Sequence, residues 1–166
     1  MIGMKKTLFT GAGTALITPF NESGIDWEAF GRLIDFQLAE GISALVPAGT
    51  TGEGTTLTAE EHEAVISFTV KRVNGRVPVI AGAGSNDTAK AIEATKAACS
   101  AGADAVLLVT PHYNKTTQRG LIAHFSAIAD ASSVPCVLYN VPSRTGLNML
   151  PETLNVLADH ERIVAV

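Results

Sequence analysis

One stretch of the sequence, Ala105-Val106-Leu107-Leu108-Val109-Thr110-Pro111-His112-Tyr113-Asn114-Lys115, contains a pattern that recurs along this chain of 166 residues. Five apolar residues follow one another without polar alternation, which is typical of a strand buried on both faces of a parallel sheet. Polar and aromatic side chains come directly after them, where parallel α/β folds form their ligand sites. The stretch therefore predicts a buried parallel strand that ends in a functional loop.

Similar apolar runs occur along the rest of the chain, at Thr14–Thr18, Ser43–Val46, Val77–Ala81, Cys136–Tyr139 and Ile163–Val166. Segments with helical periodicity separate these runs. Three of these helices are expected to run from Asp26 to Gly41, from Thr58 to Gly75, and from Asn86 or Asp87 to Gly102. Two further helices are expected to begin at Thr117 and at Pro151. The strands begin about 30 residues apart, which is the size of one βα unit. The sequence thus predicts an α/β fold with six strands and five intervening helices.

Two architectures fit this order of elements, a doubly wound sheet and a (β/α)8 barrel. The segments after four of the strands are rich in polar residues and glycine, namely Pro47–Gly54, Gly82–Asn86, Thr110–Lys115 and Asn140–Gly146. A doubly wound sheet concentrates its site at one switch point, whereas a barrel uses loops from many strands. The barrel is therefore favoured. Residues 1–166 are expected to be the N-terminal portion of a single barrel domain and to end at strand six, since a complete barrel needs about 250 residues.

Composition excludes several classes of function. The chain has 12 Lys and Arg against 16 Asp and Glu, and this net charge of -4 argues against a nucleic-acid partner. No apolar run approaches the roughly 20 residues that span a bilayer, and no apolar segment of a signal peptide follows Met1–Lys6. Cys99 and Cys136 form no CxxC motif, which fits a reducing compartment. A cytoplasmic protein that binds neither membrane nor nucleic acid is predicted.

The run Gly49-Thr50-Thr51-Gly52-Glu53 follows the second predicted strand. Its glycines allow close approach of a ligand to the backbone, and its two hydroxyls suit a carboxylate or a proton relay. The structural alternative is a tight turn in which Thr50 or Thr51 only satisfies backbone groups. No Gly-Lys-Ser/Thr sequence follows, so the run is not a phosphate-binding P-loop.

The run Tyr139-Asn140-Val141-Pro142-Ser143-Arg144-Thr145-Gly146 is more specific. A phenol at the end of a buried strand can move or orient a proton, and an arginine in a Pro- and Gly-bounded loop suits a carboxylate. The alternatives are a core tyrosine and a solvated surface charge. Tyr113 also lies at the end of a predicted strand, and the chain has only two tyrosines.

The remaining polar residues contain no other recognisable catalytic set. There is no GxSxG sequence, no pair of carboxylates expected at one site and no HExxH motif. The four histidines are scattered along the chain at positions His62, His112, His124 and His160. Three of them, all except His112, fall on predicted helices, where a surface position is expected. No metal site is predicted.

In their order and spacing, the Gly49–Glu53 run, the Pro111-x-Tyr113-Asn114 segment and the Tyr139–Gly146 run closely resemble the dihydrodipicolinate synthase family of Schiff-base lyases. This resemblance implies a (β/α)8 barrel with a C-terminal helical extension, assembled as a homotetramer of two tight dimers. It also implies condensation of pyruvate with L-aspartate 4-semialdehyde to 4-hydroxy-tetrahydrodipicolinate, in lysine and diaminopimelate biosynthesis. The reaction uses a lysine Schiff base and no cofactor.

Roles for individual residues follow from the same resemblance. Thr51, Tyr113 and Tyr139 match the family's catalytic proton relay, and family members lend the tyrosine at position 113 across the tight-dimer interface. Thr50 and Thr51 match substrate-binding threonines. Arg144 matches the arginine that holds the semialdehyde's carboxylate. The Schiff-base lysine is expected immediately after Val166, so the polypeptide of residues 1–166 alone is expected to be inactive and poorly folded.

Two other functions stay open at this point. Sibling pyruvate-dependent aldolases, such as N-acetylneuraminate lyase and keto-deoxy sugar acid aldolases, resemble the chain in fold. They commonly have Ser where Thr51 stands, and they lack the Ser143–Gly146 run. The second alternative is a non-catalytic α/β module that binds an anion through its Gly-rich loops. Gly-rich loops and threonines fit such a module, but two tyrosines and an arginine gathered at strand ends do not.

Feedback inhibition by free lysine is expected to be weak or absent. In lysine-inhibited family members an acidic side chain receives the ligand's ammonium, and the matching residue here is Lys90. His112 stands where that pocket has a tyrosine, while His62 and Asn86 do match it. A repulsive charge in place of an attractive one opposes binding of the cation.

Overall fold

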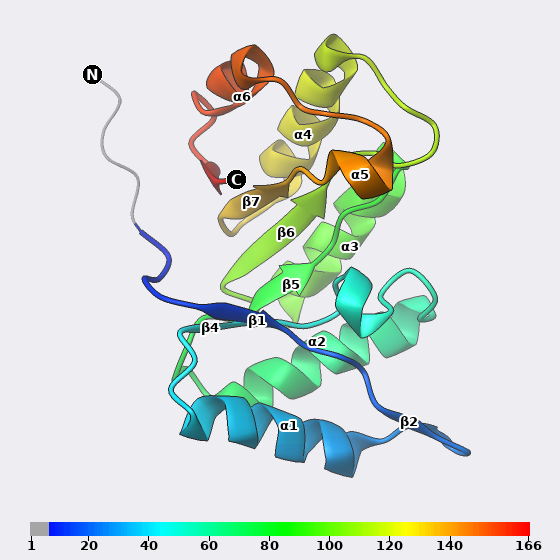
Figure 1. The fold of residues 1–166 in the computed structure, drawn as a ribbon, viewed down its shortest axis with the longest axis vertical. Coiled ribbons are helices and arrows are strands. Elements are labelled where there is room, and N and C mark those ends of the chain that lie inside the picture. The colour runs from blue at the N-terminus through cyan, green and yellow to red at the C-terminus, as the bar shows by residue number, and fades with distance from the viewer. Residues whose placement is uncertain (1–6) are drawn as a thin grey trace.

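The computed structural model describes residues 7–166, in which six parallel strands lie side by side in chain order (Figure 1). Their bounds are β1 Gly13–Ala15, β4 Ala44–Val46, β5 Ile80–Gly82, β6 Ala105–Val109, β7 Cys136–Tyr139 and β8 Ile163–Ala165. β1 pairs with β4, and β5, β6, β7 and β8 pair in sequence. An isolated bridge between Leu45 and Val79, and a hydrogen bond of 3.0 Å from Gly82 N to Pro47 O, connect β4 to β5.

This strand order separates the two architectures. In a doubly wound sheet the order reverses at a switch point, whereas in a barrel each strand lies beside the one before it. Among the described residues every consecutive pair of parallel strands is adjacent. The predicted fold class, part of a (β/α)8 barrel, is confirmed.

The helices begin where the sequence signals predict. Their bounds are α1 Trp27–Ala39, α2 Ala59–Val73, α3 Thr88–Ser100, α4 Gln118–Ala131 and α6 Pro151–Leu157. Side chains of Asp26, Thr58, Asp87 and Thr117 accept hydrogen bonds from the first turns of α1 to α4, and Thr58 completes a capping box with Glu61. Asp87, rather than Asn86, caps α3. No helix within residues 7–166 has the length and apolar character to cross a membrane.

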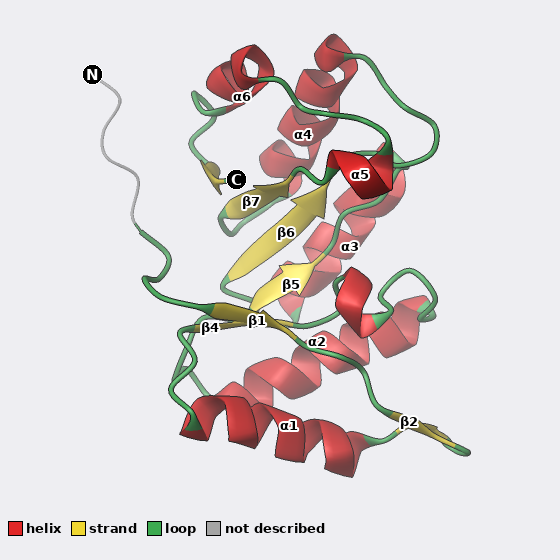
Figure 2. Cartoon of the chain, in the orientation of Figure 1, coloured by secondary structure: helices red, strands yellow, loops and turns green. Residues whose placement is uncertain are grey.

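The two faces of the strands have different surroundings. Alternate strand residues such as Leu45, Val106 and Leu138 pack with the helices in the main core. The intervening residues, including Ala44, Leu107 and Val137, form a second cluster on the face that no helix of residues 7–166 covers (Figure 2). In a barrel this second face is the interior. The alternation therefore assigns each side chain at a strand end to the interior or to the helical layer.

Several boundaries differ from the predictions. The first strand ends at Ala15 rather than Thr18, and a short hairpin of β2 (Phe20–Asn21) and β3 (Gly24–Ile25) precedes α1. The run predicted at 77–81 forms a continuous strand only over Ile80–Gly82, since Val79 makes just an isolated bridge to Leu45 and its N–H donates to Asp104 Oδ2 at 2.8 Å. A short helix, α5 (Pro142–Thr145), forms inside a segment that was predicted as loop. Pro142 at its first position favours this turn.

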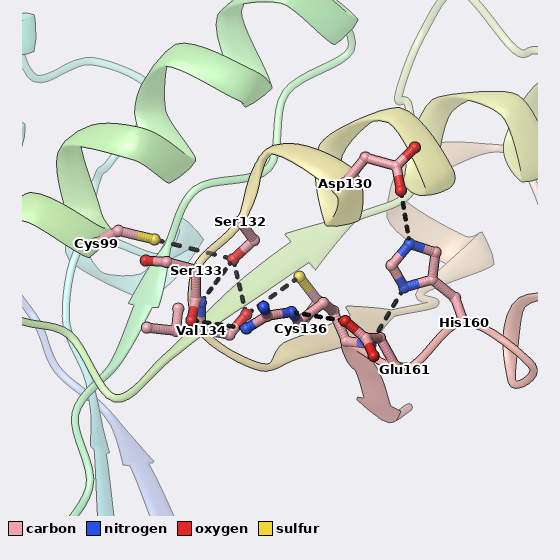
Figure 3. A network of polar contacts seen from close by, with 9 residues as sticks. Cys99, Asp130, Ser132, Ser133, Val134, Cys136, His160 and Glu161 are labelled. Atoms are coloured by element: carbon pink, nitrogen blue, oxygen red, sulfur yellow. Dashed lines mark hydrogen bonds and ion pairs between the residues drawn. The ribbon is translucent and has the colours of Figure 1, made fainter. Parts of the chain in front are cut away.

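Two histidines do not lie where the helical pattern predicted. His124 is on α4, but it is only 6% exposed, because it faces the α3 side of the helical layer, with Thr88 Oγ1 2.8 Å from its Nδ1. His160 follows α6 and belongs to a polar network at the amino ends of β7 and β8 (Figure 3). The Arg162 N–H donates to His160 Nδ1 at 3.1 Å, so Nε2 carries the proton and donates to Asp130 at 3.0 Å.

The same network brings the two cysteines near a shared serine. Ser132 Oγ lies 3.8 Å from Cys99 Sγ and donates to the Val134 carbonyl at 2.7 Å. Cys136 Sγ donates weakly to that carbonyl at 3.9 Å (Figure 3). Burial raises the pKa of Cys136 to about 11, so its thiol stays protonated at neutral pH. In barrel folds this end of the strands serves stability rather than catalysis.

Candidate active site

The loops that were predicted to carry the functional residues lie at the carboxyl ends of the strands. In Figure 1 the arrowheads of β5 and β6 point toward the side on which α5 lies. The 3-10 turn Thr50–Gly52 follows β4, the loop with Tyr113 follows β6, and α5 with Arg144 follows β7. Since all these strands are parallel, their following loops share one edge of the sheet. This edge is the candidate active site.

The turn that carries Thr50 and Thr51 is held by close backbone packing. Ala48 adopts a left-handed φ of 54°, and its carbonyl occupies the space that a Cβ would take at Gly54 or at Gly82. Thr18 Oγ1 donates to the Gly52 carbonyl at 2.7 Å. The turn is thus fixed in place while the side chains of both threonines stay exposed.

Tyr139 is the last residue of β7 and lies on the interior face. It is two positions after Val137, whose side chain belongs to the interior cluster. Its carbonyl accepts a hydrogen bond of 3.0 Å from Thr110 N, so the backbone is fixed up to the strand end. The side chain is 39% exposed. A phenol in this position is available to a substrate inside the barrel mouth.

Arg144 lies in the last turn of α5 and is exposed. Gly146 ends this helix with a left-handed φ of 69°. Thr145, the last residue of the helix, is buried. Thr145 Oγ1 donates to the Leu147 carbonyl at 2.9 Å, which fixes the chain direction after the helix. The guanidinium is therefore presented from a structured turn rather than from a free loop.

Tyr113 differs from the other candidates because its side chain is 91% exposed. Its φ of 66° is unusual for a bulky residue. Two amides hold the backbone around it. Asn86 Nδ2 donates to the His112 carbonyl at 3.2 Å, and Asn114 Nδ2 donates to the Asn86 carbonyl at 3.1 Å. The side chain of Tyr113 is thus held away from the surface of its own chain.

The predicted site residues are brought to one edge, but their side chains do not interact. Within residues 7–166 no hydrogen bond or ion pair involves the side chains of Thr50, Thr51, Tyr113, Tyr139 and Arg144. The proton relay expected among Thr51, Tyr113 and Tyr139 is therefore not formed within this part of the chain. These side chains therefore have no partner among the described residues 7–166.

A model of the Dihydrodipicolinate synthetase family matches residues 8–166, which include this entire edge. The chain belongs to that family.

Relatives within the family cover almost all of the chain. The 4-hydroxy-tetrahydrodipicolinate synthase of Acetivibrio thermocellus is 58% identical over 163 residues, which are 98% of this chain and 56% of that protein. A synthase of the same name from Geobacter metallireducens is 55% identical over 159 residues, with 96% and 55% covered. The chain thus spans about half the length of the curated relatives it matches.

Solved structures of family members have the same fold. The chloride-inhibited dihydrodipicolinate synthase of Acinetobacter baumannii, complexed with pyruvate, matches with a TM-score of 0.93 and 46% identity over 96% of this chain and 55% of that chain. The Thermotoga maritima dihydrodipicolinate synthase matches with a TM-score of 0.92 and 45% identity over 95% and 54%. The barrel architecture is therefore common to this chain and these synthases.

Residue-type reasoning missed several amides that organise the site. Gln118 at the start of α4, and Asn140 and Asn148 around α5, bond to the loop that carries Arg144. Asn140 and Asn114 were noted only as parts of motifs, and Asn114 holds the backbone beside Tyr113. The available signal was their position directly after strands or loops, where free backbone groups need side-chain partners. Without the tertiary structure, their bonding partners could not be assigned.

Burial lowers the pKa of His124, and a pH dependence of stability follows. The folded state then binds a proton less readily than the unfolded chain, whose histidine pKa is about 6.5. We expect the free energy of unfolding of the full-length protein to fall as pH drops through this value. Urea unfolding between about pH 8 and pH 5 measures the slope, and a His124→Gln variant should have a shallower one. Equal slopes in both proteins would contradict the assignment.

Proposed function

We propose that the full-length protein condenses pyruvate with L-aspartate 4-semialdehyde through a lysine Schiff base. The product is 4-hydroxy-tetrahydrodipicolinate, the reaction belongs to lysine and diaminopimelate biosynthesis, and we assign it to the cytoplasm. The relatives named above, at 58% and 55% identity, support this activity over that of the sibling aldolases. The reaction needs no metal or organic cofactor, because the imine itself serves as the electron sink.

The observation that carries this proposal is the pairing of β7 with β8. Cys136 lies opposite Ile163, and an irregularity then shifts the parallel register by one residue, so that Val137 lies opposite Ala165. Two residues further along, Tyr139 would lie opposite the position after Val166, on the same interior face. We propose that a lysine occupies this position. Its amine would then stand beside the Tyr139 phenol, as a Schiff-base mechanism with a local proton donor requires.

In the proposed reaction the neutral lysine amine adds to C2 of pyruvate, and the ketone oxygen leaves as water to give an imine. Loss of a proton from C3 then gives an enamine. C3 bonds to the aldehyde carbon of the second substrate, whose oxygen takes up a proton. Attack of the semialdehyde's own amine on the imine carbon releases the lysine and closes the ring. Tyr139 moves the protons, with Thr51 and Tyr113 relaying them to solvent.

The assembly is part of the same proposal. We infer a homotetramer of two tight dimers in which Tyr113 completes the site of a second copy. Tyr113 is 91% exposed and has a left-handed backbone. Both features cost free energy in a single copy of the chain, and contact with a second copy would offset that cost. The two amide hydrogen bonds on either side of it preserve the geometry needed for delivery to a neighbour.

Arg144→Ala should mainly affect the second substrate. The exposed guanidinium on α5 is assigned to the semialdehyde's carboxylate, and loss of a charged hydrogen-bonding partner costs about 1.5–3 kcal/mol, or roughly 10- to 100-fold in apparent affinity. We expect the KM for the semialdehyde to rise by that factor while the KM for pyruvate changes less than about twofold. Steady-state kinetics with each substrate varied in turn measures both. Equal increases in the two KM values would refute the assignment.

Borohydride reduction in the presence of pyruvate tests the Schiff base. Intact-mass measurement of the full-length protein should reveal a covalent pyruvate-derived adduct, which peptide mapping should place on the residue after Val166. A non-catalytic anion-binding module would keep its mass unchanged, and that result would overturn the proposal. Assays with the semialdehyde, sialic acid and keto-deoxy sugar acids then separate the synthase from the sibling aldolases.

A further inference from the structure

Gln118, the first residue of α4, makes three hydrogen bonds to residues 148–153, where the loop that carries Arg144 (residues 140–149, the Arg144 loop) ends and α6 begins. Its Nε2 donates to the Asn148 carbonyl at 2.8 Å. Its Oε1 accepts from Leu150 N at 3.1 Å and from Thr153 Oγ1 at 2.6 Å. One side chain thereby joins the helix after β6 to the loop after β7. The two connections are neighbours only in the folded chain, because 30 residues or more separate the bonded groups.

A second amide closes the same loop from its other end. Asn140, directly after β7, accepts a hydrogen bond from Met149 N at 3.0 Å and donates to the Met149 carbonyl at 3.3 Å. Its Nδ2 also donates to Asn148 Oδ1 at 2.8 Å. Residues 140 and 149 are therefore tied together, and the segment between them forms a loop with α5 at its tip.

Arg144 lies within this closed loop and has no side-chain partner of its own in residues 7–166. The position of its guanidinium therefore depends on how the ends of the loop are held. Asn140 fixes the ends to each other, whereas Gln118 fixes the loop to the neighbouring helix. Without the Gln118 bonds the loop could tilt as a unit, because its internal hydrogen bonds would remain.

We propose that Gln118 is a positioning residue, which anchors the Arg144 loop to α4 and thereby sets the apparent affinity for the carboxylate of the second substrate. This inference rests on the proposed function. The amide is the required group, since Nε2 must donate to a carbonyl while Oε1 accepts from two donors. A glutamate of the same shape keeps the acceptors but places an oxygen against the Asn148 carbonyl, where no donor remains.

Gln118→Glu in the full-length protein is the direct test. The KM for the semialdehyde should rise about tenfold, while kcat and the KM for pyruvate change less than about twofold. Gln37→Glu is the matched control. Gln37, the only other glutamine, also accepts a hydrogen bond, from Thr14 Oγ1 at 2.9 Å, but it lies on α1. Its substitution should leave all three kinetic constants unchanged.

Two further measurements separate positioning from a general loss of structure. In an Arg144→Ala background, Gln118→Glu should no longer raise the KM for the semialdehyde, because the residue through which it acts is gone. Hydrogen exchange of residues 141–150 should be at least about fivefold faster in Gln118→Glu and unchanged in Gln37→Glu.

A KM unaffected by Gln118→Glu, an equal effect in the Arg144→Ala background, or unchanged exchange would each overturn the inference. A wild-type protein that forms no pyruvate adduct would instead overturn the proposed function. In that case the hydrogen-exchange measurement still tests whether Gln118 anchors the loop. Faster exchange of residues 141–150 in Gln118→Glu would support the anchoring, and unchanged exchange would refute it.

Discussion

Tyr139→Phe is expected to lower kcat of the full-length protein by roughly 10²–10⁴-fold, the range associated with a positioned proton-transfer group. The substitution removes one oxygen from a side chain whose backbone is fixed by β7 and by the hydrogen bond from Thr110 N. Folding should therefore be unaffected, and the melting temperature should stay within about 2 °C of wild type. Steady-state kinetics at saturating concentrations of both substrates measures the effect.

Thr51→Val provides an independent check of the same relay. The methyl group replaces the hydroxyl at similar volume, so kcat should fall in the same direction as in Tyr139→Phe. Thr55→Val is the matched control, because Thr55 is exposed in the same loop but has no assigned role. Losses below about threefold in both Tyr139→Phe and Thr51→Val would remove the relay from the mechanism.

Gly82→Ala is expected to lower the free energy of unfolding by about 3 kcal/mol, at the upper end of the cost of overpacking. A Cβ at this position would lie 2.7 Å from both Ala48 C and Gly49 N, and backbone atoms cannot move aside as a flexible side chain can. Relief would require β5 and the turn after β4 to separate. Urea unfolding of the full-length protein measures the change.

Gly49→Ala is the control for this prediction. Gly49 has a φ of -78°, and among residues 7–166, its two chain neighbours aside, an added Cβ would meet only Val46 Cγ1, at 4.0 Å. Its free energy of unfolding should change by less than about 1 kcal/mol. If Gly82→Ala were no more destabilising than Gly49→Ala, the close packing of Ala48 against β5 would not hold in solution.

The sequence was sufficient for the elements whose signals are local. Thr58 and Glu61 have the spacing of a capping box, and the structure forms one. The apolar run at Ala105–Val109 is β6 with the same bounds. The loops after β4, β6 and β7 could also be selected, because they break an otherwise apolar repeat with glycines, hydroxyls, phenols and an arginine. These features depend on residue type and spacing within a few positions.

The burial of the histidines and the hydrogen-bond partners of the amides could not be predicted from residue type and spacing. The pattern around His124 is that of an amphipathic helix, and only the packing of α4 against α3 determines that this residue faces inward. Gln118 looks like any polar residue at a helix start, yet its partners lie 30 or more residues away. Such contacts depend on where two connections meet in space, which short-range periodicity does not encode.

The sequence by itself thus determined the repeating βα order, the helix starts and the chemical types available for catalysis, because each follows from hydrogen bonding and burial within a single unit. The tertiary structure alone decided which side chains share a face and which are held in place. Tyr139 lies on the interior face because β7 alternates in register with β6, and Tyr113 points away because Asn86 and Asn114 hold its left-handed backbone. Register and long-range hydrogen bonds arise only when separate units pack together.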